Sequence, residues 1–241
     1  MESVAWLQDV VYILCTRSST ILRFSTSTRQ RLADIDIDGL VSPHHIVACD
    51  TTSQLFIADF ECVWRFSADG AVVQRWVTLA APWTLSVTRG RLLMTVPHGS
   101  RLVQFDVGGN ELMRFSLKGE VEPRHAVALR TGTFVVSCTV RGSHSAVGEV
   151  TDKGEVVQWF RSSSLRWPDL LDVDARGNVL VSDTYNSRIL LLSARLALVR
   201  VLIDERQLNG KPLRGFCFVE QTGQLLVALQ DGVVEFKLLS S

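Results

Sequence analysis

The chain has 241 residues, of which 46% are apolar and 21% are charged. These proportions are ordinary for a globular protein and exclude an intrinsically disordered chain. The 25 basic residues balance the 25 acidic residues, so net charge provides no general attraction to nucleic acid or to anionic membranes. No segment approaches the roughly 18 consecutive apolar residues of a membrane helix, and no basic region precedes the first apolar stretch. We therefore expect neither a membrane span nor a signal peptide.

The five cysteines are odd in number and form no CxxC pair. Most lie within apolar runs, as Cys49 does after Ile46 to Ala48. This pattern favours small core residues in a reducing compartment, and hence a cytoplasmic protein. The cysteines are Cys15, Cys49, Cys62, Cys138 and Cys217.

The chain begins with four apolar runs of strand length. They are Ser3 to Leu7, Val10 to Cys15, Thr20 to Phe24 and Arg31 to Ile37. Each is rich in β-branched or large apolar residues and is bounded by turn residues, which is typical of short antiparallel strands. The same order of runs then recurs along the chain behind a proline. These prolines are Pro43, Pro82, Pro123, Pro168 and Pro212, at intervals of 39, 41, 45 and 44 residues.

Four short strands in roughly 40 residues are the signature of one blade of a β-propeller. The sequence therefore predicts a single all-β domain, a six-bladed β-propeller. The predicted blades are residues 1–41, 42–80, 81–121, 122–166, 167–210 and 211–241. Five positions after each proline the residue is small, as expected for the innermost strands where they converge on the axis. These residues are Ala48, Val87, Ala128, Val173 and Cys217.

The last blade has room for only three strands, Arg214 to Val219, Leu225 to Leu229 and Val233 to Leu238. Since Ser3 to Leu7 falls in register as the innermost strand of the first blade, it does not complete the last one. We expect the first and sixth blades to meet by side-chain packing without a shared strand. The third strand would then be an exposed edge that invites another strand, either from the rest of a longer chain or from a second molecule.

The fifth blade resembles an NHL repeat through Pro168, Val181-Ser182-Asp183 and Asn186-Ser187-Arg188-Ile189, and the second blade through Ile57-Ala58-Asp59. At the position of the repeat's aspartate the other blades depart from the pattern, with Cys15, Val96, Cys138 and Leu229. NHL propellers form the C-terminal substrate- or RNA-binding domain of tripartite-motif ubiquitin ligases. The RING and B-box parts of a ligase are absent from this sequence, so the resemblance implies a recognition module.

In such blades the proline loops and the loops between second and third strands share one rim, which we term the top face. All five histidines map to it, together with the aromatic residues Phe60, Trp83 and Tyr185. Arginines with interleaved aromatic residues are suited to an acidic or aromatic peptide, or to single-stranded RNA. The predicted binding residues are Arg17, His45, Trp83, Arg101, Arg124, His125, Arg141, Tyr185 and Arg214.

Enzymatic and metal-dependent functions find weaker support. His45 and His125 are placed to face each other across the channel mouth, as in a zinc-dependent lyase, but the equivalent residues of other blades cannot complete a zinc site. The segment from Asp34 to Gly39 resembles the start of a calcium-binding loop. Its alternation of aspartate and isoleucine nevertheless favours an edge strand with the aspartates facing water. Asp183 and Arg188 are expected to tie their loop together. We expect a noncatalytic scaffold for a protein or peptide with no cofactor, with single-stranded RNA binding, a lyase-like enzyme and a surface without a partner as alternatives.

Overall fold

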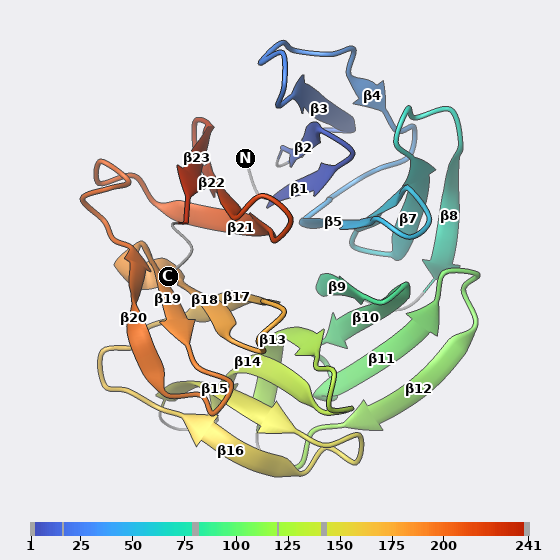
Figure 1. Cartoon of the computed structure of the whole chain (residues 1–241). Helices are drawn as coiled ribbons and strands as arrows, with labels where there is room; N and C mark the ends of the chain where they lie inside the picture. Colours follow the sequence, from blue (N-terminus) through green and yellow to red (C-terminus); the bar gives the residue numbers. More distant parts are fainter. Residues whose placement is uncertain (1–2, 16, 79–81, 120, 141–143, 239–241) are drawn as a thin grey trace.

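The computed structural model describes residues 3–15, 17–78, 82–119, 121–140 and 144–238. Six antiparallel sheets surround a central axis, and strands β1, β5, β9, β13, β17 and β21 lie innermost (Figure 1). The fold is the six-bladed β-propeller that the repeat predicts. Within the described ranges, the only helix is the three-residue 3-10 turn Thr184–Asn186, and no helix there is long and apolar enough to cross a bilayer.

The strands of each blade follow the chain from the axis outward. Blade one contains β1 (Ser3–Leu7), β2 (Val10–Leu14), β3 (Thr20–Ser25) and β4 (Ile35–Asp36). Blade two contains β5 (His45–Cys49), β6 (Gln54–Ala58), β7 (Cys62–Ser67) and β8 (Val73–Thr78). Blade three contains β9 (Thr84–Thr88), β10 (Arg91–Val96), β11 (Arg101–Asp106) and β12 (Glu111–Ser116).

Blade four contains β13 (Val121–Ala128), β14 (Phe134–Val140), β15 (His144–Val150) and β16 (Val156–Phe160). Blade five contains β17 (Pro168–Val173), β18 (Val179–Asp183), β19 (Arg188–Leu192) and β20 (Leu198–Ile203). Blade six contains β21 (Leu213–Val219), β22 (Gln224–Leu229) and β23 (Val233–Lys237). In the described part of the chain, blade six thus has three strands, and β1 pairs with β2 rather than with blade six, as predicted.

Each repeated proline stands at the entry to an inner strand. Pro43, Pro82 and Pro212 precede β5, β9 and β21, and Pro168 opens β17. Pro123 lies inside β13, because this strand begins at Val121 and its pairing with β14 shifts register between Pro123 and His125. A proline is tolerated there because such an irregularity leaves a backbone position without a ladder bond.

The core lies between neighbouring blades, which explains the different patterns of the strands. Second strands such as β18 are buried along their whole length, because adjacent blades cover both faces of the sheet. Outer strands such as β12 alternate between half-buried and exposed side chains. In blade one the outer strand is only Ile35–Asp36, with one further bridge between Phe24 and Arg31, and Asp36 accepts a hydrogen bond from Thr20 at 2.6 Å. The segment is therefore the expected edge strand, but a shorter one than predicted.

Candidate functional site

The top face carries a concentration of exposed aromatic side chains. Among the described residues, the large aromatic side chains that remain exposed are Phe60, Trp83, Trp167 and Tyr185, and all four lie in top-face loops. Trp83 is 44% exposed and Tyr185 is 70% exposed. Since burial of an aromatic ring is strongly favourable, a cluster of exposed rings marks a surface suited to binding.

Two of these rings line a depression of about 300 Å³, which we term the Trp83 depression. His44 packs on Trp83 with ring centroids 5.3 Å apart, and its Nε2 lies 3.3 Å from the carbonyl oxygen of Pro82. These contacts hold the indole of Trp83 at the entry to blade three. The depression is lined by His44, Phe60, Pro82, Trp83, Pro97, His98, Glu122, Pro123 and Arg124.

A second depression, of about 410 Å³, lies at the entries to blades five and six; we term it the Tyr185 depression. It is lined by Trp167, Asp169, Thr184, Tyr185, Pro212, Leu213 and Arg214. Arg166 lies over the ring of Tyr185 at 5.3 Å from its centroid. The guanidinium of Arg124, which lines the first depression, lies 3.8 Å from the centroid of Trp167, which lines the second. This cation–π pair joins the two depressions into one surface.

Buried aspartates fix the loops that carry this surface. Asp183 accepts hydrogen bonds from the backbone nitrogen of Arg166 at 2.8 Å, from Asn186 at 2.7 Å and from Arg188 at 2.7 Å. Asp59 does the same in blade two, with bonds from the backbone of Ser42 and from the indole of Trp64. Asp183 and Arg188 thus have the structural role expected of the NHL-like signature.

His45 and His125 are not part of the accessible surface. They are 7% and 3% exposed, and their ring centroids lie 5.4 Å apart, so they do face each other across the channel. His45 Nδ1 accepts from the backbone nitrogen of Leu85 at 3.2 Å, and His125 Nδ1 accepts from that of Leu171 at 3.1 Å. The prediction that these two rings lie on the exposed top face is wrong, because both belong to inner strands and pack inward.

Burial sets the charge state of both histidines. It lowers the pKa of His125 to about 4, and burial together with the nearby His125 and His44 lowers that of His45 well below its ordinary value. Both rings are therefore neutral at physiological pH. The His125 Nε2 donates to the carbonyl oxygen of Leu85 at 3.0 Å. These bonds connect the inner strands of blades two to five.

The other predicted residues are distributed unevenly. Trp83, Arg124, Tyr185 and Arg214 converge on the two depressions. Arg17 is exposed in the β2–β3 loop and lines neither of them. Arg101 folds back onto its own loop, where Nη2 donates to the carbonyl oxygen of His98 at 3.4 Å. Arg141 lies outside the described residues.

Trp167 was not among the binding residues predicted from the sequence. It lies immediately before Pro168, so it belongs to a proline loop, and its place there was a usable signal. Its backbone φ of 64° is uncommon for a bulky residue and could not be expected from composition. This conformation accompanies the placement of the ring beneath Arg124.

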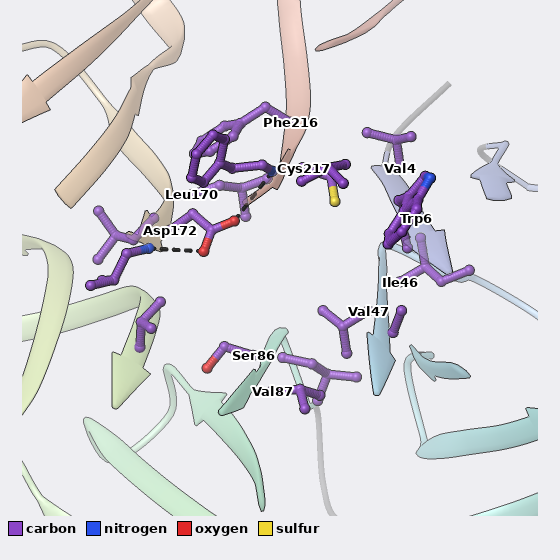
Figure 2. A pocket seen from close by; sticks show the side chains of 18 of the residues that line it. Val4, Trp6, Ile46, Val47, Ser86, Val87, Leu170, Asp172, Phe216 and Cys217 are labelled. Carbon is purple, nitrogen blue, oxygen red and sulfur yellow. Dashed lines mark hydrogen bonds between the residues drawn. The ribbon is translucent and has the colours of Figure 1, made fainter. Parts of the chain in front are cut away.

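The central channel contains a cavity of about 270 Å³ (Figure 2). Of the predicted small residues near the axis, Ala48, Val87, Val173 and Cys217 line it. The inner strands therefore leave open space near the axis where we expected close packing. The buried side chains of His45, His125, Leu170 and Phe216 occupy the channel on the top-face side. No group of three histidine, cysteine or acidic residues placed to hold a metal ion occurs among the described residues.

No protein-family model and no curated protein matches the sequence. Solved structures match over nearly the whole chain. A protein of unknown function from Bacteroides caccae has a TM-score of 0.76 and 15% identity over 95% of this chain and 89% of its own. A gluconolactonase from Xanthomonas campestris has a TM-score of 0.73 and 14% identity over 96% and 84%. A chain of a nidogen–laminin complex has a TM-score of 0.65 and 15% identity over 86% and 81%.

These proteins differ in function, and the identities are too low to carry a function from any of them to this chain. The structural likeness is to propellers that include an enzyme, a chain from a protein complex and a protein of unknown function. What it shows is the fold: this chain is a six-bladed β-propeller that resembles them in shape.

Proposed function

We propose that this propeller is a noncatalytic recognition module that binds an extended peptide segment of a partner protein across the top face. The observation that supports it is the pair of depressions joined by Arg124 and Trp167. An extended peptide can place one side chain in each depression. The Trp83 depression, lined by aromatic rings and prolines, suits an apolar or proline side chain, whereas Arg214 at the Tyr185 depression suits an acidic one.

The charges on this surface favour a peptide over single-stranded RNA. Each depression has a carboxylate in its lining, Glu122 in one and Asp169 in the other, so the surface is not the continuous basic groove that follows a phosphate backbone. The rings of Trp167 and Tyr185 are also covered on one face by the guanidinium groups of Arg124 and Arg166. Less ring surface is then left for the base stacking on which single-strand binding depends. The nidogen–laminin match adds that a chain of this shape occurs in a protein complex.

The test begins with peptides selected from a random library on the immobilised protein, whose affinities are then measured by calorimetry. We expect Trp83→Ala to weaken binding by tenfold or more, because a central aromatic anchor contributes about 2 kcal/mol or more. Arg214→Glu should weaken acidic peptides specifically. The matched control is Arg195→Glu, which makes the same charge change at an exposed residue of the β19–β20 loop, on the opposite face.

The same protein is titrated with a labelled single-stranded RNA at two salt concentrations. Tight, salt-dependent RNA binding with no selected peptide would favour the RNA alternative and contradict the proposal. Peptide binding that is unaffected by Trp83→Ala and by charge reversal of Arg124 and Arg214 would exclude the top face as the binding surface.

A further inference from the structure

The cavity in the central channel has a distinctly acidic lining. Asp50, Asp172 and Glu220 contribute to it, whereas no lysine or arginine does so among the described residues. Asp50 and Glu220 are exposed at the ends of inner strands, on the face opposite the top face, and Asp172 lies deeper. A ligand entering from that face therefore passes two carboxylates before it reaches a third.

Asp172 is a recessed carboxylate without a counterion. Its side chain accepts from the backbone nitrogens of Val173 at 2.8 Å and Phe218 at 3.3 Å. No ion pair to it occurs in the described part of the chain. Burial, with a smaller contribution from the charge of Glu220, raises the pKa of this carboxyl to about 6. Recessed carboxylates are usually paired with a cation, so the cavity has the charge that a cationic ligand would complement.

The wall opposite Asp172 is apolar and aromatic. Figure 2 shows Trp6 on the far side of the cavity from Asp172, with Val47 and Val87 at its edge. An indole ring attracts organic cations through its face and also packs against their apolar parts. The volume of about 270 Å³ is slightly below the range typical of drug-sized ligands. The cavity therefore suits a small molecule that is charged at one end and apolar at the other.

A metal ion fits this lining less well. Structural metal sites gather several ligands around one point, and no three acidic, histidine or cysteine residues are grouped in that way among those described. Glu220 already accepts from the backbone nitrogen of Ala175, and Asp50 lies 3.4 Å from the amide nitrogen of Gln221. The carboxylates are distributed along the cavity instead of converging.

We propose that the central cavity binds a small organic cation, a primary ammonium group on an apolar or aromatic body, with the ammonium at Asp172 and the body against Trp6. This site is separate from the top face and does not rest on peptide binding there. Cation binding here gives a function to Asp172 and to the central cavity, neither of which takes part in peptide binding at the top face.

Benzylamine is a suitable probe, and benzyl alcohol is its neutral counterpart of similar shape. In calorimetry with the full chain, we expect one benzylamine to bind per protein and benzyl alcohol to bind at least tenfold more weakly. Asp172→Asn should weaken benzylamine by tenfold or more, because a charge-assisted hydrogen bond is lost. The control Asp152→Asn removes the same charge from an exposed loop outside the cavity and should leave binding unchanged.

Asp172 also accepts a hydrogen bond from the backbone of the neighbouring blade, so its substitution removes a contact between blades as well. A second variant therefore tests the cavity while keeping Asp172. Val47→Phe places a ring in the cavity from blade two and should abolish benzylamine binding in a protein that circular dichroism shows to be folded. Equal affinities of the wild type and the folded Asp172→Asn protein would overturn the proposal. So would the absence of benzylamine binding, or calcium binding that displaces benzylamine.

Discussion

His125 connects three neighbouring inner strands through a neutral imidazole ring, with bonds to the backbone of Leu85 and Leu171. Burial lowers its pKa from 6.5 to about 4. The folded state therefore binds fewer protons than the unfolded state between pH 4 and 6.5. The stability that this group contributes is complete above pH 6.5 and is lost as the pH falls toward 4. We expect the loss to be about 3 kcal/mol.

The variant His125→Asn tests this effect, because asparagine does not titrate and its side-chain oxygen can accept from Leu171. It also removes the charge of His125 that helps to lower the pKa of His45, which changes the pH dependence in the same direction. Urea unfolding of both proteins should show that the advantage of the wild type shrinks between neutral pH and pH 4. Asp172, whose pKa is raised to about 6, has the opposite effect: its contribution is lost as the pH rises through 6. It is present in both proteins and cancels in the difference. A difference that is independent of pH would contradict the assignment.

For individual side chains, the sequence predicted the position along the blade but not the direction in which the side chain points. The positions of His45 and His125 relative to their prolines predicted that they face each other, since the repeat fixes the depth of a residue along the axis. Whether the rings turn inward depends on space between blades and on backbone partners such as Leu85. Those partners lie in other repeats, and no local pattern reveals them. The pairing of Arg124 with Trp167 was hidden for the same reason, because the two residues come from different blades.

At the scale of the strand and loop, most of the fold could be predicted from the sequence. Strands such as β10 and β18 combine apolar runs with turn residues at both ends, and that pattern predicts where they lie. The outer strand of blade one was overestimated, because alternating Asp and Ile residues predict an edge strand whether or not a partner lies alongside. Its observed length, Ile35–Asp36, is set by pairing with β3, which the local sequence does not encode.

The loop held by Asp183 permits a test of the blade signature. Asp183 is fully buried and forms an ion pair with Arg188 at 2.7 Å, so Asp183→Asn leaves the guanidinium without its charged partner. We expect a loss of about 3 kcal/mol in the free energy of unfolding. Thermal and urea unfolding measure it. The exposed pair Lys211–Asp231 is the control, and Asp231→Asn should cause no measurable change. Equal effects of the two variants would argue against a structural role for Asp183.

At the scale of the whole molecule, the ring closes between blades six and one by side-chain packing. The cluster at this seam consists of Val4, Val11, Ile13, Val219, Leu226 and Ala228. Among the described residues it is the smallest of the six core clusters. The outer strands of these two blades add little further pairing, since β4 has only two residues and β23 is the outermost strand of a three-stranded sheet. Pairing of the β23 edge with a strand from another molecule remains a prediction.

This asymmetry predicts where the ring opens first. Local opening follows the regions with the least buried apolar contact and the fewest shared hydrogen bonds, so β22 and β23 should open before their equivalents in blade five, β18 and β19. Hydrogen exchange followed by mass spectrometry measures the difference under native conditions. We expect peptides covering Gln224–Lys237 to exchange faster than those covering Val179–Leu192, in which β19 is flanked by β18 and β20. Equal protection of the two segments would show that side-chain packing at the seam closes the ring as firmly as a complete four-stranded blade does.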